Sequence, residues 1–363
     1  MSAIKYNWTK QEILDVYNKP LMSLLYEAAT VHRQHHDPNT VQVSTLLSIK
    51  TGGCPEDCGY CPQAARYHTD IEGNDLMTVQ QVKAQALRAK SSGSSRVCMG
   101  AAWRNVKDGK EFDQVLEMVR TINKLDMEVC CTLGMLTENQ AKRLAEAGLY
   151  AYNHNLDSSE EYYKEVISTR GFEDRLKTID NVRKTNVTVC SGGIIGMGET
   201  LEDRAGMLVA LSTLNPQPES TPINALVAVE GTPLEDQKPV SIWDMVRMVA
   251  TTRIVMPRTQ VRLSAGRTQM TREGQAMCFF AGANSIFSGD KLLTTPNPDV
   301  NEDMEMFKLL GLTPQEPFVK KTQPKTVEAS DSEFESLGEK PKWSRPKHTI
   351  TRNENAKSKA LHN

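Results

Sequence analysis

The chain has 363 residues, of which 39% are hydrophobic and 24% charged, so it can bury a large core. Its formal net charge of −2 argues against a protein that binds nucleic acid by neutralising phosphates, and no apolar run is long enough to span a membrane. Because the N-terminus lacks the apolar stretch of a signal peptide, we expect a cytoplasmic protein whose eight cysteines are metal ligands or catalytic groups rather than disulfides.

The predicted elements alternate between strand and helix along most of the chain. After a polar, helix-compatible opening, eight short β-rich segments recur, at Val43–Lys50, Ser95–Ala101, Glu128–Leu133, Tyr150–Leu156, Thr188–Ile195, Ile223–Val229, Gln260–Ala265 and Asn284–Ser288. Between most of them lie segments with helical periodicity, at Thr78–Lys90, Phe112–Leu125, Thr137–Ala147, Thr200–Leu214 and Ile242–Met256.

This alternation predicts an α/β protein, because strands joined by helical crossovers pair in parallel. Eight such units indicate a closed (βα)8 TIM-type barrel, which we place at residues 38–313 after an N-terminal helical extension over residues 1–37. Beyond about Thr313 the periodicity stops and Pro, Lys, Ser and Glu dominate. Residues 314–363 are therefore expected to be a polar, flexible tail without a packed core.

The strongest chemical signal is the triplet Cys54, Cys58 and Cys61, spaced C-x3-C-x2-C just after the first predicted strand. Four-iron clusters are normally held by one Cys thiolate per iron, so three thiolates leave one iron open to another ligand. The alternative is zinc, since His68 lies seven residues on and could complete a Cys3His site. Zinc is less favoured because the second C-x2-C pair of a structural zinc site is missing.

A second signal is dispersed over three predicted strands, which carry Cys98, Cys130 and Cys190. A barrel brings its strands around one lumen, so inward side chains from different strands can meet. Any one of these residues alone would more often be a buried, inert cysteine. Cys130 and Cys131 are adjacent and point to opposite faces, so only one can face the lumen, and we expect it to be Cys130.

The triplet resembles the signature of the radical S-adenosylmethionine superfamily, in which it follows the first barrel strand and an aromatic residue precedes the last Cys. Tyr60 stands at that position. The resemblance implies a 4Fe-4S cluster whose open iron is chelated by S-adenosylmethionine. One-electron reduction of the sulfonium then gives a 5′-deoxyadenosyl radical, which abstracts hydrogen from unactivated carbon.

Within this superfamily the chain resembles the biotin synthase family, over roughly residues 40–312. The blocks that carry the likeness are SIKTGGCPEDC, CMGAAW, YNHNLD, CSGGI, VRLSAGR and LLTTPNP. The resemblance implies that Cys98, Cys130, Cys190 and Arg262 hold a 2Fe-2S cluster. It also implies a radical sulfurtransferase that replaces two carbon–hydrogen bonds of dethiobiotin with bonds to one sulfur taken from that cluster.

Further roles follow from the resemblance alone. It implies contacts to S-adenosylmethionine or substrate from Tyr60, Asn153, Asn155, Asp157 and Arg175, and contacts to dethiobiotin from Asn224, Thr294 and Thr295. No protein acid or base is expected, because the clusters carry the chemistry. An electron donor such as flavodoxin, an iron–sulfur assembly system and a homodimer are implied in the same way.

Three further sequence features and two alternative functions also have to be considered. The Gly-rich segment from Cys190 to Glu199 lacks both phosphate-binding fingerprints, so we interpret it as a strand end that approaches a ligand closely. Cys278 lies in an apolar helical stretch and is expected in the core, and His154 has no assigned role. Lipoyl synthase or a maturase of similar barrel form is one alternative, although residues 1–53 lack the cysteines that lipoyl synthase needs. A zinc-stabilised barrel acting as a binding module is the other.

Overall fold

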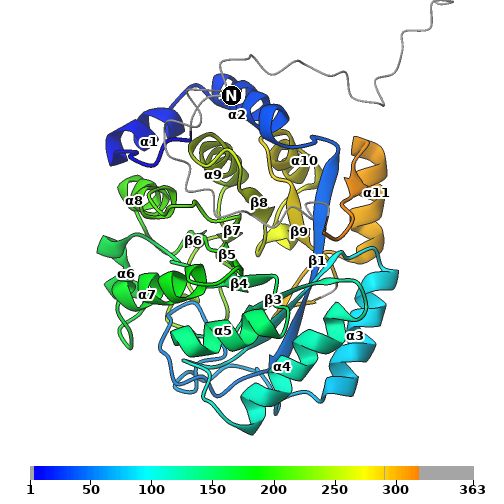
Figure 1. Ribbon diagram of the computed structural model, residues 1–363. Helices are drawn as coiled ribbons and strands as arrows, with labels where there is room; N and C mark the ends of the chain where they lie inside the picture. Colours follow the sequence, from blue (N-terminus) through cyan, green and yellow to red (C-terminus); the bar gives the residue numbers. More distant parts are fainter. Residues whose placement is uncertain (1–3, 290, 319–363) are drawn as a thin grey trace, which may run out of the picture. The chain divides into compact units, whose positions relative to one another are not determined.

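The computed structural model describes residues 4–289 and 291–318, and its centre is a barrel of parallel strands (Figure 1). The strand order is β1-β2-β3-β4-β5-β7-β8-β9, and β9 pairs with β1 to close the barrel. β6 occupies the same position as β5, because both pair with β7. The barrel strands are β1 (Thr40–Lys50), β2 (Arg96–Ala101), β3 (Glu128–Thr132), β4 (Ala151–Asn153), β5 (Thr188–Cys190), β6 (Gly193–Ile195), β7 (Ser220–Ala225), β8 (Gln260–Leu263) and β9 (Ser285–Phe287).

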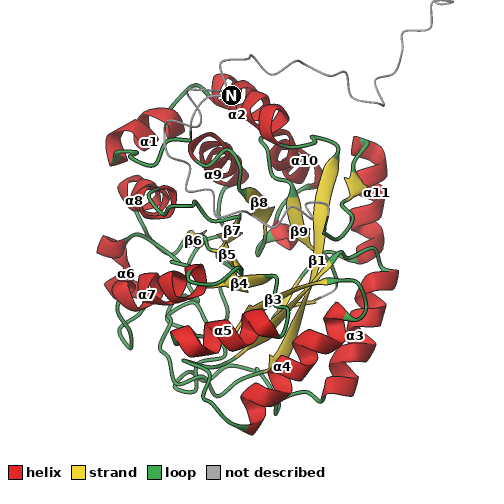
Figure 2. Ribbon diagram, viewed as in Figure 1, coloured by secondary structure: helices red, strands yellow, loops and turns green. Residues whose placement is uncertain are grey.

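The helices lie outside the strands (Figure 2). They are α1 (Lys10–Tyr17), α2 (Leu21–His35), α3 (Val79–Ser91), α4 (Lys110–Asn123), α5 (Glu138–Glu146), α6 (Glu160–Val166), α7 (Phe172–Arg183), α8 (Leu201–Ser212), α9 (Ile242–Val255), α10 (Arg272–Phe280) and α11 (Val300–Leu310). Four of them begin with a reciprocal capping box, in which a Thr and the acid or amide three residues later satisfy each other's backbone N–H groups. The four Thr caps are Thr9, Thr78, Thr137 and Thr200.

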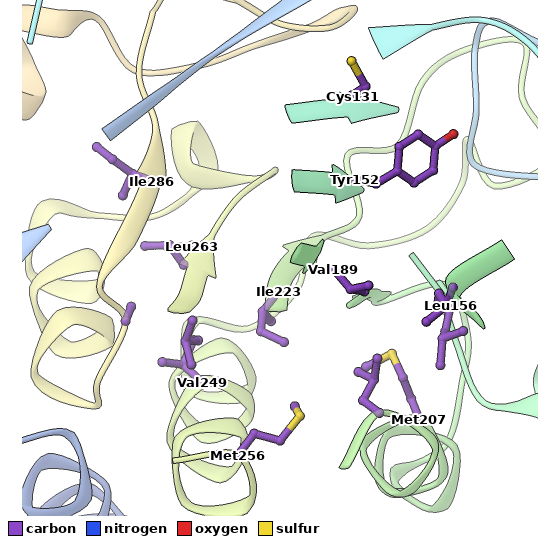
Figure 3. Packing of buried hydrophobic residues seen from close by; sticks show 14 of the residues in the cluster. Cys131, Tyr152, Leu156, Val189, Met207, Ile223, Val249, Met256, Leu263 and Ile286 are labelled. Carbon is purple, nitrogen blue, oxygen red and sulfur yellow. The ribbon is translucent and has the colours of Figure 1, made fainter. Parts of the chain in front are cut away.

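The main core lies between the strands and the surrounding helices. Figure 3 shows outward side chains such as Ile223 and Leu263 directed toward Val249 of α9, with Met207 of α8 nearby. Cys131 of β3 belongs to this outer core and is fully buried. A smaller apolar cluster lines the lumen and includes Cys98 and Cys130. Strand alternation has therefore separated two apolar layers, one on each side of the barrel wall.

The predicted barrel is confirmed, with one strand divided. The segment predicted as Thr188–Ile195 forms β5 and β6, with a break at Ser191 and Gly192. Gly193 pairs with Ile223 of β7, so Gly192 lies opposite Pro222, which has no backbone N–H for the ladder. A side chain on Gly192 would lie 2.0 Å from the Pro222 carbonyl oxygen. Gly192 is therefore close to neighbouring backbone, and Ile194 of the same segment lines the cavity described below, so the expected approach of this strand end to a ligand stays a prediction.

Further elements frame the barrel. The predicted N-terminal extension contains α1 and α2, which contact α8 and α9. A short antiparallel pair, β10 (Lys291–Leu292) and β11 (Thr295–Pro296), follows β9, and β12 (Thr313–Pro314) pairs with the start of β1. Most of the predicted tail, residues 319–363, lies outside the described residues. No helix in the described ranges has the length and hydropathy needed to cross a bilayer.

Candidate active site

One cavity of about 320 Å³ opens at the carboxyl ends of the strands, the end where barrel enzymes build their sites. Every residue that the sequence predicted for the site lines it except Cys190. The lining includes two separate groups of thiols, one from the loop after β1 and one from barrel strands. The cavity therefore brings together residues up to 249 positions apart, from Leu46 to Thr295.

The first group, Cys54, Cys58 and Cys61, lies on a loop that folds back on itself. Cys61 N–H donates to the Cys58 carbonyl at 2.9 Å, and Cys54 exchanges backbone hydrogen bonds with residues 63 and 65 at 3.0 and 2.8 Å. These bonds fix the loop backbone, and all three side chains line the cavity. Burial raises the pKa of all three thiols, that of Cys61 to about 12.

The second group comes from strands β2, β3 and β5 of the barrel wall. Cys98 of β2 is directly opposite Cys130 of β3 in the ladder, and both line the cavity. Cys131, the next residue, points into the outer core (Figure 3), as alternation predicts. Cys190 ends β5, where it pairs with Asn153 and Ser220 on the flanking strands. Its sulfur lies 3.8 Å from Nη1 of Arg262, which places it beside the same group.

Cys98 and Cys130 are hydrogen-bonded to each other across the ladder. Burial opposes ionisation of both, but the bond from Cys130 and the cations Arg262 and Arg96 lower the pKa of Cys98 to about 7. The same bond raises the pKa of Cys130. One thiolate can therefore exist in this group near neutral pH, which suits a metal-binding site.

Arg262 on β8 is 1% exposed and is held by three polar partners. Nε donates to Ser285 Oγ at 2.9 Å, and Nη2 donates to Gln42 Oε1 at 3.0 Å. The third is the 3.8 Å contact from Nη1 to the sulfur of Cys190. The guanidinium also stacks on the Phe287 ring, with 4.6 Å between Cζ and the ring centroid. As predicted, Arg262 faces the lumen, and its partners fix its orientation there.

Tyr60, Asp157 and Arg175 form one hydrogen-bonded group at the cavity wall. Tyr60 donates its hydroxyl hydrogen to Asp157 at 2.8 Å, and Arg175 makes an ion pair with the same carboxylate. Nε of Arg175 also donates to the hydroxyl of Tyr163 at 3.0 Å. A carboxylate between a phenol and a guanidinium is held in one orientation by charge-assisted hydrogen bonds.

Some of the amide side chains predicted to contact ligands form hydrogen bonds with the backbone. Asn155 accepts a bond from the Gly192 N–H at 3.2 Å. Asn224 donates to the Gly193 carbonyl at 2.9 Å and accepts from the Ala265 N–H at 3.1 Å, so it ties β6 to the end of β8. Thr294 and Thr295 reach the cavity from the turn of the β10–β11 hairpin. Hydrogen bonds to backbone therefore fix the orientation of Asn155 and Asn224.

Two residues outside the predicted ligand set also have defined surroundings. His154 lines the cavity, and burial, followed by the cations Arg175 and Arg170, holds its pKa well below the ordinary value, so it is neutral. Cys278 lies in α10 and is fully buried in the outer core, as predicted.

Charged residues that the sequence did not single out surround both thiol groups. Glu56 and Arg170 line the cavity beside the loop thiols. Arg96 and Glu128 form a buried ion pair at 2.7 Å, two residues before Cys98 and Cys130 on the same strands. Alternate residues of a strand point to the same face, so Arg96 and Glu128 share the inward face of Cys98 and Cys130. The alternation of the predicted strands could therefore have identified this ion pair. No local pattern marked Arg170, which follows α6.

The thiols of both groups are the donors that hold iron–sulfur clusters in proteins. Within residues 4–289 and 291–318, no three His, Cys, Asp or Glu side chains converge on a site for one metal ion. A cluster needs thiolates spread around several irons, and metal coordination supplies the positive charge that deprotonates buried thiols of raised pKa. The buried cations Arg96 and Arg262 add to this compensation at the second group.

Comparison with known proteins identifies the family. The Radical SAM superfamily model matches residues 48–211, and the Biotin and Thiamin Synthesis associated domain matches residues 222–313. The chain is 85% identical to a biotin synthase of Flavobacterium psychrophilum over 97% of this chain and 98% of that protein. It is 83% identical to a biotin synthase of Christiangramia forsetii over 99% of this chain and 100% of that one. The chain belongs to the biotin synthase family.

The resemblance seen in the sequence motifs is thereby confirmed and extended. Because the alignment with the Christiangramia forsetii biotin synthase spans 362 residues, it reaches through the tail, for which the motifs offered no counterpart. Membership of the radical SAM superfamily implies S-adenosylmethionine and an iron–sulfur cluster as cofactors. Among solved structures, a methylornithine synthase superposes with a TM-score of 0.73 at 17% identity, covering 91% of this chain and 97% of that one, which shows the shared fold.

Proposed function

We propose that the chain forms biotin by inserting sulfur into dethiobiotin, with S-adenosylmethionine as the source of radicals. The observation that carries the proposal is the single cavity lined by two separate thiol groups. Sulfur insertion needs a radical source and a sulfur source, with the substrate between them. A barrel whose loop and strands each supply a group of thiols offers both within one enclosure.

Cys54, Cys58 and Cys61 would hold a 4Fe-4S cluster, and Cys98, Cys130, Cys190 and Arg262 would hold a 2Fe-2S cluster. When bound, the first cluster with S-adenosylmethionine supplies hydrogen-abstracting radicals, and the second supplies the sulfur. The support for the first set is its three thiols on one fixed loop, of which Cys58 is buried and the other two partly exposed. For the second, it is the contact between Cys190 and Arg262 together with the paired thiols of Cys98 and Cys130.

The other residues of the cavity position ligands and exclude water. Asp157, fixed by Tyr60 and Arg175, can accept both hydroxyls of a ribose, and Arg175 retains donors for a carboxylate. Asn153, Asn155 and Asn224 offer amides to the nucleoside or to the ureido group of dethiobiotin, and Thr294 and Thr295 face them from the hairpin. His154 is neutral and is assigned no proton transfer, which agrees with radical chemistry.

We infer a flavodoxin-type electron donor, an iron–sulfur assembly system, a homodimer and a cytoplasmic location from the same resemblance. The division into an extension at 1–37, a barrel at 38–313 and a tail at 314–363 also stands as our proposal.

The test is anaerobic turnover of the reconstituted chain with dethiobiotin, S-adenosylmethionine and a one-electron reductant. We expect 5′-deoxyadenosine, methionine and biotin as products. A matched reaction without dethiobiotin controls for uncoupled cleavage of S-adenosylmethionine. Deoxyadenosine without biotin, from protein that contains both clusters, would overturn the assignment of substrate.

A further inference from the structure

The loop that carries the first three thiols is fastened to the segment between α6 and α7. The Gly59 N–H donates to the Val166 carbonyl at 2.9 Å. The carboxylate of Asp57 accepts bonds from the backbone N–H groups of Ser168 and Thr169 at 3.0 and 3.1 Å. This fastening brings Arg170, the next residue, against the cysteine loop.

Arg170 lies beside Cys58 and is almost completely enclosed. Its Nη2 donates to the sulfur of Cys58 at 3.8 Å, and its side chain is 7% exposed. Its Nε has no hydrogen-bond acceptor among the described residues. A cation in a site with little water acts strongly on nearby charge, because the surroundings screen it weakly.

Glu56 supplies the opposite charge in the same place. Its side chain is 3% exposed, and its Oε1 lies 3.9 Å from Nη1 of Arg170 and 3.6 Å from Nε of Arg104. Oε1 accepts no hydrogen bond from the described residues, although Thr169 donates to the other oxygen. Both Glu56 and Arg170 line the cavity together with Cys54 and Cys58. Because its ion pairs are long and it is shielded from water, the negative charge of this carboxylate acts strongly on groups nearby.

We propose that Arg170 and Glu56 set the reduction potential of the first cluster in opposite directions. The inference rests on the proposed function, since it needs a cluster on Cys54, Cys58 and Cys61. One-electron reduction adds negative charge to the cluster and its thiolates. The Arg170 cation and its N–H donor to Cys58 favour that reduced state, whereas the Glu56 carboxylate opposes it.

A purely structural role makes a different prediction. If Arg170 and Glu56 only fasten the loop, removing either charge loosens the same contact. Both variants would then lose iron or shift the potential in the same direction. The sign of the shift, measured for each charge separately, therefore distinguishes tuning from fastening.

The experiment compares full-length variants Arg170→Gln and Glu56→Gln with wild type, each reconstituted anaerobically with iron and sulfide. The midpoint potential is measured by following the electron paramagnetic resonance signal of the reduced 4Fe-4S cluster during a redox titration. Arg66→Gln is the matched control, because Arg66 is half-exposed and lies 3.7 Å from Asp57 on the same loop, where solvent screens its charge. Iron content is determined for every sample.

We expect a more negative potential in Arg170→Gln, a less negative one in Glu56→Gln and no shift in Arg66→Gln. Arg170→Lys, which keeps the charge but loses the planar fork, should lie between wild type and Arg170→Gln. Shifts of the same sign in the two main variants, or no shift with full iron content, would overturn the inference. Loss of iron from both Arg170→Gln and Arg170→Lys would also overturn it, in favour of fastening. A wild-type protein without the reduced-cluster signal would instead defeat the proposed function.

Discussion

The two thiol groups are built in different ways, one on a loop and one on strands. Cys54, Cys58 and Cys61 lie within eight residues of sequence, and turns in the loop backbone bring them together. Cys98, Cys130 and Cys190 are spread over 93 residues, and only closure of the barrel makes them neighbours. The first group can be identified from spacing, whereas the second can be identified only after the fold is assigned.

The two thiol groups also differ in the parts of the chain that surround them. The loop group is fastened mainly to one other segment, the region from Val166 to Arg170, through backbone groups and the Arg170 side chain. It also contacts Asp157 through Tyr60 and Arg104 through Glu56. The strand group lies within the barrel wall and is backed by a polar network from five strands, in which Gln42 connects Arg262 to Glu128. We therefore expect damage to the loop site to stop all turnover, and damage to the strand site to stop only the later chemistry.

The largest effect should come from removing one loop thiol. Cys54→Ala, Cys58→Ala or Cys61→Ala should each abolish reductive cleavage of S-adenosylmethionine, because two thiolates cannot hold a cluster with one open iron. The measurement is 5′-deoxyadenosine formed under reducing conditions. Normal production from any of the three variants would break the assignment of the loop site.

Loss of a strand thiol should separate the two activities. Cys98→Ala and Cys190→Ala should retain the 4Fe-4S cluster and some cleavage of S-adenosylmethionine but lose biotin formation, because their side chains face the second site. Parallel assays of deoxyadenosine and biotin on the same samples make the comparison. Full biotin yield in both variants would remove these cysteines from the sulfur source.

Arg262 should have a smaller effect than the cysteines. Arg262→Ala and Arg262→Lys should alter the visible spectrum of the 2Fe-2S cluster and leave residual biotin formation, since three thiolates provide most of the binding. Gln42→Leu should give a weaker change of the same kind, because it removes the acceptor that orients the Arg262 fork. Unchanged spectra in both Arg262 variants would withdraw Arg262 from the ligand set.

The smallest effect is expected at Cys131, which serves as the matched control for Cys130. Cys131→Ser should leave cluster content and activity near wild type, because the side chain points into the outer core. Its free energy of unfolding should fall by about 1 to 3 kcal/mol, the usual cost of burying an unpaired hydroxyl. Thermal denaturation and iron analysis would check both parts, and loss of the 2Fe-2S absorption would reverse the assignment of Cys130 and Cys131.

Much of the fold followed from the sequence because hydrophobic periodicity and turn residues act locally. All eight predicted strands and all five predicted helices are present, and the opening residues form α1 and α2. Short helices such as α6 were not predicted, since seven residues give too little periodicity. The division of the fifth strand was missed because it depends on Pro222, which lies on a neighbouring strand.

The site was less predictable because its electrostatics come from residues distant in sequence. The partner of Arg96 is Glu128 on the next strand, and the contact of Arg170 with Cys58 crosses 112 residues. Neither pairing has a local motif. Contacts predicted for Asn155 and Asn224 stay predictions, since both amides also bond to backbone and their ligand roles depend on bound molecules. The tail beyond Phe318 lies outside the described residues, so its predicted lack of a core stays a prediction as well.

The central claim is that two different clusters share one cavity and that the second provides the sulfur. Mössbauer spectroscopy of the 57Fe-enriched protein, before and after a single turnover with dethiobiotin and S-adenosylmethionine, tests it most directly. We predict both 4Fe-4S and 2Fe-2S signals at the start, with the 2Fe-2S signal falling as biotin appears and the 4Fe-4S signal remaining. A single cluster type, or biotin formation with an undiminished 2Fe-2S signal, would contradict the claim.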